Sequence, residues 1–545
     1  MALPRKPRLD FSDKRFLIID DFGDMRSMLR HMVESYGVTR IDTAATAKEA
    51  LRLMERHPYD VVLCDYNLGE GQDGQQLLEE AKHRRLIQFA TVFMMLTAEN
   101  TMQMVMGAVE YYPDDYLSKP FNKHTLRQRL EKIMLRKQDL LAVDKLVQKG
   151  ELEQAIEECD RRIARKPRNL REFQKLKGEL CLRLGRYEAA EMLYREVLAE
   201  RSVPWARLGL GQVYFHTGRL EAARDCFQEI VAENQHHMEA HDWLARTLEA
   251  LGEAEAAQAC LEQAARLSPK AIQRQMALGD LALRRKDFAC AARAFKKAVK
   301  LGEHSVYKSP ANYSKQAQAM IHTSGKKDAL RVLKKLRQDF PHDDEARLHA
   351  ALAENAVYDA LGRQDESRAA YDEACKLFEA HAGQWPAELV LEMSKTHIAN
   401  GDENRGKELI KGLVRNHHED EALLQRVQEA FSDLGMAEEG RALISDNRNK
   451  VVQLNNQGVR LVQEGRLEEA ISLFEEALQD LPANKTINMN TAMVLLKYME
   501  KHGRHDGYLG QVRRCLDMLR EHASPGSGLE QLQERYNRIV KSHAA

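Results

Sequence analysis

The chain has few of the features that mark membrane, secreted or disulfide-bonded proteins. It contains 8 cysteines in 545 residues, scattered without a Cys-x-x-Cys pair, which argues against a disulfide framework or a structural zinc site. The sequence has no run of 18 apolar residues and no signal peptide pattern. We therefore expect a soluble cytoplasmic protein with reduced thiols.

The chain also lacks an excess of charge of either sign, and it lacks familiar enzyme motifs. The 82 lysines and arginines nearly balance 83 aspartates and glutamates, so the net charge of −1 argues against a nucleic-acid-binding field over the whole chain. Patterns typical of a P-loop, a His-Glu-x-x-His metalloprotease or a Gly-x-Ser-x-Gly hydrolase do not occur. We expect no independent catalytic domain and no membrane partner.

The first 121 residues contain four polar signatures, each directly after a short apolar run. Such runs alternate with amphipathic stretches, which predicts buried parallel strands in a doubly wound α/β order. Folds of this kind gather functional groups at the carboxyl ends of the strands. The signatures are Asp20-Asp21 after residues 16–19, Asp65 after residues 61–64, Thr97-Ala98 after residues 92–96, and Lys119-Pro120 after residues 116–118.

Three of these residues are carboxylates that are expected to meet at one sheet edge. Asp20, Asp21 and Asp65 would repel one another unless a cation lay between them. Carboxylates without thiolate or imidazole partners suit a hard, oxygen-preferring ion, so we predict a Mg²⁺ site.

The same group of residues suits phosphoryl transfer. A carboxylate can be a nucleophile, and the transfer needs mainly in-line geometry and neutralised charge, so we assign Asp65 as the phosphoacceptor and Lys119 as the counter-charge. The Thr97 hydroxyl can donate to a phosphoryl oxygen, and Tyr116 is placed to move with it.

These residues and spacings resemble the response regulator receiver domain of two-component signalling, over residues 11–135. The resemblance implies a histidine kinase as phosphodonor, Asp20 and Asp21 as metal ligands with the backbone carbonyl of Asn67, and a cis peptide before Pro120. It also implies that Thr97 and Tyr116 form a switch pair, that Lys119 binds the phosphoryl group, and that Asn67 and Glu99 tune hydrolysis. One stretch departs from the pattern, because residues 65–74 have glycine where many members have proline.

Internal repetition is the second strong signal, beginning near residue 138. Alanines at matching places, Ala155, Ala190, Ala223, Ala257 and Ala291, are spaced by 35, 33, 34 and 34 residues. A large residue follows each one helical turn later, where it can fill the groove between paired helices. Further copies occur at residues 329, 362 and 465, with a fainter one near residue 401.

The repeats look like a tetratricopeptide array, with Leu210-Gly211 and Leu278-Gly279 supplying its small-residue packing signature. We thus expect an α/β receiver with a doubly wound parallel five-stranded sheet, followed by an all-α helical-repeat solenoid. The expected ranges are 11–135 for the receiver, 138–303 for a first block of repeats, 304–450 for degenerate repeats, 451–500 for a repeat and following helix, and 501–545 for a C-terminal helical cap. Interruptions are expected at residues 302–325 and 400–450.

The two parts are expected to share a helix. Residues 122–146 contain no glycine or proline and keep an apolar stripe, so the last receiver helix can continue into the first repeat. A shared helix would transmit rotation between the parts, and the alternative is a loosely tethered receiver.

Solenoids of helical pairs present a concave surface that suits peptides or helices. Asn456 and Asn490 are 34 residues apart and are expected at equivalent places on that surface, where they would contact a ligand's main chain. The favoured function is a response regulator whose array binds partner proteins under control of phosphorylation. The alternatives are a transcription regulator with an unrecognised C-terminal module and a phosphate sink for a kinase; self-association also stays open.

Overall fold

The computed structural model describes residues 9–98, 113–323, 325–521 and 528–541. The chain divides into two compact units, Met1–Val332 and Leu333–Ala545, and each is described by itself. The first unit contains a parallel sheet and the first part of a helical array. The second unit is helical throughout its described secondary structure.

The sheet has five parallel strands in the order β2-β1-β3-β4-β5. Their apolar side chains are buried, as the continuous runs in the sequence predict for strands covered on both faces. The strands are β1 (Arg15–Ile19), β2 (Arg40–Ala44), β3 (Val61–Asp65), β4 (Val92–Thr97) and β5 (Asp115–Ser118).

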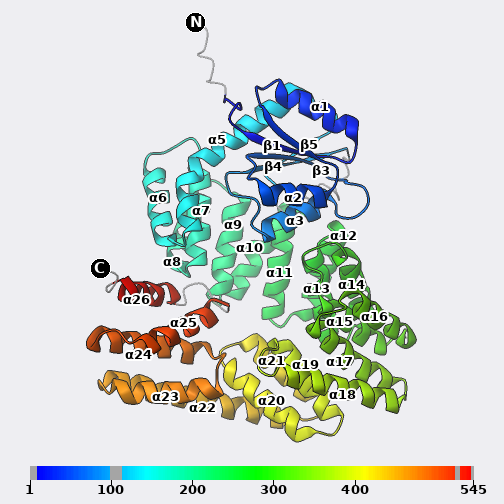
Figure 1. Ribbon diagram of the computed structural model, residues 1–545, viewed down its shortest axis with the longest axis vertical. Helices are drawn as coiled ribbons and strands as arrows, with labels where there is room; N and C mark the ends of the chain where they lie inside the picture. Colours follow the sequence, from blue (N-terminus) through cyan, green and yellow to red (C-terminus); the bar gives the residue numbers. More distant parts are fainter. Residues whose placement is uncertain (1–8, 99–112, 324, 522–527, 542–545) are drawn as a thin grey trace. The chain divides into compact units, whose positions relative to one another are not determined.

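Helices cover both faces of the sheet (Figure 1). Leu29 and Val33 of α1 (Gly23–Glu34) and Leu126 and Leu130 of α5 (Lys123–Gln148) pack on one face. The other face packs against α2 (Ala47–Arg56) and α3 (Gly74–His83). This is the doubly wound arrangement that the sequence predicts.

Helix α5 belongs to both the sheet domain and the array. Its first half packs on the sheet through Leu126 to Met134, and Lys137 forms an ion pair of 2.8 Å with Asp114. Its second half places Leu140 and Val143 in the apolar core of the first helical hairpins. The expected shared helix is therefore confirmed as a continuous element.

In the first unit each helix of the array packs against the next helix along the chain, and we call each such pair a hairpin. These helices are α6 (Leu152–Ala164), α7 (Leu170–Arg183), α8 (Tyr187–Glu200), α9 (Pro204–His216), α10 (Leu220–Glu233), α11 (Met238–Ala250), α12 (Ala254–Leu267), α13 (Ile272–Arg284), α14 (Phe288–Gly302) and α15 (Pro310–Ile321). Helix α16 (Lys326–Asp339) spans the boundary between the units. The segment at residues 302–325, where an interruption was expected, therefore includes α15.

The second unit continues in the same way. Its helices are α17 (Asp344–Ala360), α18 (Gln364–Ala380), α19 (Ala387–Ala399), α20 (Glu403–Asn416), α21 (Glu421–Asp433), α22 (Ala437–Gln463), α23 (Leu467–Asp480), α24 (Lys485–His502), α25 (Asp506–Glu521) and α26 (Leu529–Lys541). Residues 400–450, also expected to interrupt the array, form helices that pack on their neighbours. Among the described residues, no helix is both long and apolar enough to cross a membrane.

Glycines in the first helices of the hairpins make room for aromatic rings. A Cβ added to Gly211 would lie 2.6 Å from Phe227, and one added to Gly279 would lie 2.7 Å from Phe295. Tyr194 occupies the space beside two glycines at once, Gly178 and Gly209. The repeating small residue and the large residue of the sequence pattern are thus direct contact partners.

This packing predicts a large loss of stability for Gly458→Ala. A Cβ at Gly458 would lie 2.2 Å from the ring of Phe474, which is fully buried, so the helices must separate. Overpacking of this kind costs about 1–3 kcal/mol or more. Chemical denaturation followed by circular dichroism measures the loss. Gly412→Ala is the matched control, because its Cβ would meet nothing within 4 Å and alanine favours a helix; equal effects of the two changes would contradict the packing argument.

Candidate functional site

The three predicted carboxylates meet at the carboxyl edge of the sheet. Strands β1 and β3 are neighbours with Ile19 opposite Cys64, so the residues that follow, Asp20 and Asp65, end side by side. Asp21 completes the group, and single carboxylate oxygens of the three residues all lie within 4.8 Å of one another. The structure therefore brings together the acidic residues that the sequence places in separate segments.

The geometry of this group fits a bound cation. Asp20 is fully buried, and one carboxylate oxygen of Asp21, Oδ1, is buried without a hydrogen-bond partner. An anionic oxygen in that position is costly unless a positive charge approaches it. Gly69 lies beside the other oxygen, since a Cβ there would be 3.4 Å from Asp21 Oδ2. Three carboxylates of this kind are oxygen ligands that suit Mg²⁺.

Lys119 contacts two of the three carboxylates. Its Nζ donates to Asp65 Oδ1 at 2.8 Å and to Asp20 Oδ2 at 2.9 Å. Burial lowers the pKa of Lys119, but these two contacts outweigh burial and raise the pKa overall. Burial raises the pKa of Asp65; Lys119 opposes that rise, and the charge of Asp20 adds to it. The lysine is therefore a charged partner held against the predicted acceptor.

Thr97 and Tyr116 lie on the neighbouring strands β4 and β5. Thr97 is buried, and its carbonyl oxygen accepts a hydrogen bond of 2.7 Å from the backbone N–H of Lys119. The Tyr116 hydroxyl is buried without a hydrogen-bond partner, and burial raises its pKa. The ring packs against the apolar cluster on the α2 and α3 face, which includes Tyr66. Glu99, predicted to tune hydrolysis, lies outside the described residues.

The backbone conformation of the loop after Asp65 explains why this loop has glycine where many receiver domains have proline. Gly69 and Gly71 have φ values of +76° and +102°, which other residues rarely adopt. Asn67 is exposed, and its side-chain oxygen accepts a hydrogen bond of 3.3 Å from the Gly69 N–H. The peptide between Lys119 and Pro120 is cis, as the receiver resemblance implies.

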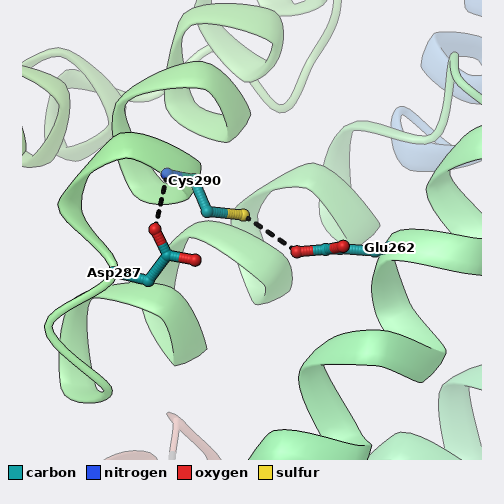
Figure 2. A group of neighbouring side chains, drawn as sticks. All are labelled: Glu262, Asp287 and Cys290. Atoms are coloured by element: carbon teal, nitrogen blue, oxygen red, sulfur yellow. Dashed lines mark hydrogen bonds between the residues drawn. The ribbon is translucent and has the colours of Figure 1, made fainter.

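A second group of acidic and thiol side chains lies in the array (Figure 2). It consists of Glu262, Asp287 and Cys290, in which Asp287 accepts a hydrogen bond of 3.0 Å from the Cys290 N–H as the N-cap of α14. The Cys290 thiol donates to Glu262 at 3.5 Å, and burial raises its pKa to about 11. Helix capping and a protonated thiol account for this group, so we do not assign a metal to it.

The array carries a groove between α11 and α13, with a volume of about 570 Å³. Arginines and carboxylates line it together. Arg274 is buried and pairs with Asp242 at 2.8 Å, while Arg284 pairs with Glu249. A mixed-charge groove on paired helices is a suitable surface for a polypeptide segment.

The asparagines predicted for the array surface lie in the second unit. Asn490 of α24 donates to the side chain of Asn455 of α22 at 2.6 Å, whereas Asn456 is exposed. The residue of α22 that contacts Asn490 therefore lies one position before Asn456. Both asparagines remain proposed contact residues for a partner.

Comparison with known proteins agrees with this architecture. Residues 16–131 match the response regulator receiver domain family, and residues 182–246 and 244–306 match two tetratricopeptide repeat families. The chain thus combines a response regulator receiver domain with tetratricopeptide repeats. No catalytic enzyme domain is among these matches.

Two curated relatives each match 122 residues of the chain. Chemotaxis protein CheY-3 of Vibrio cholerae is 29% identical over 122 residues, which are 22% of this chain and 92% of that protein. Chemotaxis protein CheY of Pseudomonas aeruginosa is 28% identical over 122 residues, 22% of this chain and 97% of its own length.

Two solved structures are similar to parts of the chain. Chemotaxis response regulator CheY4 of Vibrio cholerae is 26% identical, with a TM-score of 0.21, and covers 22% of this chain and 98% of its own. The C-terminal part of a tetratricopeptide repeat protein from Cytophaga hutchinsonii is 15% identical, with a TM-score of 0.37, and covers 45% of this chain and 97% of its own.

Proposed function

We propose that the chain is a two-component response regulator that accepts a phosphoryl group on Asp65 from a histidine kinase and binds partner proteins through its repeats under control of that phosphorylation. The observation that carries the proposal is the site itself. Asp65 lies 2.8 Å from the partly buried Lys119 and beside two further carboxylates at the sheet edge. The tetratricopeptide repeats that follow the receiver are the proposed effector.

The residues divide the transfer among them. A carboxylate oxygen of Asp65 attacks the phosphorus of a phosphohistidine, the P–N bond breaks, and its electron pair stays with the imidazole nitrogen. Lys119 moves from the carboxylates to a phosphoryl oxygen and neutralises its charge. The Thr97 hydroxyl donates to a second phosphoryl oxygen. The backbone carbonyl of Thr97 also accepts the hydrogen bond from the Lys119 N–H, so the two residues are linked through the backbone.

Asp20, Asp21, Asp65 and the carbonyl of Asn67 would hold Mg²⁺, which supplies further neutralisation of the phosphoryl oxygens when bound. The fold contributes by holding these ligand oxygens in fixed positions close to one another. Burial of Asp20 and its hydrogen bond from the Phe22 N–H, 2.9 Å long, keep its carboxylate in position.

A quantitative pull-down from source-cell lysate tests the proposal. The full chain is used in Mg²⁺ with and without beryllofluoride, which mimics the phosphoryl group, and Asp65→Ala is the control. We expect partners whose capture changes with beryllofluoride only when Asp65 is present, and weaker capture by the double variant Asn456→Ala and Asn490→Ala. Partners captured equally in every state would contradict gating, and the absence of any partner would favour a phosphate sink.

A further inference from the structure

A lysine of the array reaches the loop that follows the phosphoacceptor. Lys270, between α12 and α13, donates from Nζ to the Tyr66 hydroxyl at 2.9 Å and to Asp73 Oδ2 at 3.2 Å. The ammonium also lies 4.8 Å from the centre of the Tyr66 ring. Burial lowers the pKa of Lys270, but these contacts raise it overall, so the side chain is charged at neutral pH. A single cation therefore joins two receiver residues.

Helix α3 and the residues just before it make further contacts with the end of α14 and the segment that follows it. The side-chain amide of Gln76 donates to the carbonyl of Leu301 at 3.2 Å, and Gln72 donates to the carbonyl of His304 at 2.8 Å. Ser305 donates to the carboxylate of Glu79, and both side chains are buried. Buried polar contacts of this kind form only where two surfaces fit closely.

The receiver side of this contact lies against the acceptor itself. Tyr66 directly follows Asp65, and its carbonyl accepts a hydrogen bond of 2.8 Å from the Gly74 N–H. Gly74, the first residue of α3, is so close that an added Cβ would lie 2.2 Å from the Asp65 carbonyl oxygen. A shift of the Asp65 backbone therefore has to move the first turn of α3, where Asp73 is the N-cap.

The array side of the contact borders the groove between α11 and α13. Ala271, next to Lys270, lines the groove. Tyr307 also lines it, and its N–H donates to the Ser305 hydroxyl at 3.1 Å. Lys270 is thus one residue from the groove lining, and Ser305 is two residues from it.

We infer that Lys270 is the residue through which the array responds to the charge on Asp65, and that the α11–α13 groove is the part of the array that responds. The inference rests on the proposed function, since it requires Asp65 to be the acceptor. Phosphorylation adds negative charge one residue from Tyr66, which strengthens the attraction of a nearby cation. Because coupling is reciprocal, the docked Lys270 in turn favours the phosphorylated receiver.

Titration of the full chain with beryllofluoride in Mg²⁺, followed by ¹⁹F NMR, tests this inference. Lys270→Met keeps the aliphatic length and removes the charge, and we expect it to weaken beryllofluoride affinity about three- to tenfold. Lys270→Arg keeps the charge and should stay within about twofold of the unmodified chain. Lys297→Met, at an exposed position of α14, is the control and should leave the affinity unchanged.

Hydrogen exchange supplies a second readout. Beryllofluoride is expected to change amide protection in α11 and α13 of the unmodified chain, and Lys270→Met should remove that change. Equal affinities for Lys270→Met and Lys297→Met, or equal losses for Lys270→Met and Lys270→Arg, would overturn the inference. If the unmodified chain does not bind beryllofluoride, the assignment of Asp65 as acceptor fails instead.

Discussion

Asp65→Asn is expected to abolish phosphoryl acceptance. Asparagine preserves the shape of the side chain but has no anionic oxygen to attack phosphorus, and it removes one of the three carboxylates that meet at the sheet edge. Incubation with a small phosphoramidate donor in Mg²⁺, followed by intact-mass spectrometry, should show a phosphoryl adduct on the unmodified chain and none on the variant. Asp13→Asn, an exposed receiver carboxylate, is the control and should be phosphorylated normally.

The same variant is expected to leave the receiver folded and, without Mg²⁺, more stable at neutral pH. The pKa of Asp65 is raised in the folded state, first by burial, so the folded form binds its proton more tightly than the unfolded chain does. The stability contribution of this group therefore falls as pH rises through the carboxylate range. Asp65→Asn should flatten that part of the pH dependence of the unfolding temperature. A variant that unfolds at a lower temperature than the unmodified chain would contradict this reading of the site.

Insertion of two glycines after Gln138 is expected to uncouple the repeats from the receiver. Gln138 is exposed, between Lys137, which pairs with Asp114 in the receiver, and Leu140, which is buried among the first hairpins. Two extra residues rotate the following part of a helix by roughly 200° and lengthen it by about 3 Å. The two halves of α5 can then no longer contact the receiver and the first hairpins at the same time in their present relative orientation.

The measurement is the beryllofluoride-dependent change in amide protection of α11 and α13. We expect this change to fall to about a tenth or less of its size in the unmodified chain. A two-glycine insertion at Gly383, in the turn between α18 and α19, lengthens the chain equally and should preserve the change. A full response after the insertion at Gln138 would show that the shared helix is not needed and that the contact of Lys270 is sufficient.

The central site was predictable because its residues lie at the ends of parallel strands. Apolar runs place the strands, and the chain order of a doubly wound sheet places Asp20 beside Asp65, whereas the exact partners of Lys119 required the structure. The continuity of α5 followed from the absence of glycine and proline. The aromatic and glycine contacts, such as Phe295 with Gly279, followed from the 34-residue period.

Other contacts were not predictable from the sequence. Lys270 and Tyr66 are 204 residues apart, and neither belongs to a motif, so no local pattern indicates that they meet. The repeat spacing places Asn456 and Asn490 at equivalent positions, but it does not indicate that Asn490 donates to Asn455. A helix turns by 100° per residue, so a shift of one position moves a side chain to a different face. Repeat spacing alone does not fix the rotation of each helix to that accuracy.

The position of the Tyr194 ring determines how the first hairpins unfold locally. Its ring fills the space beside Gly178 of α7 and Gly209 of α9, so one side chain of α8 is wedged between two neighbouring hairpins. In most arrays of this type each repeat contacts only its neighbours, and the ends can fray one repeat at a time. Here α7 and α9 cannot separate from α8 independently without exposing the same ring. Helices α7 to α9 should therefore lose protection together, as one cooperative block.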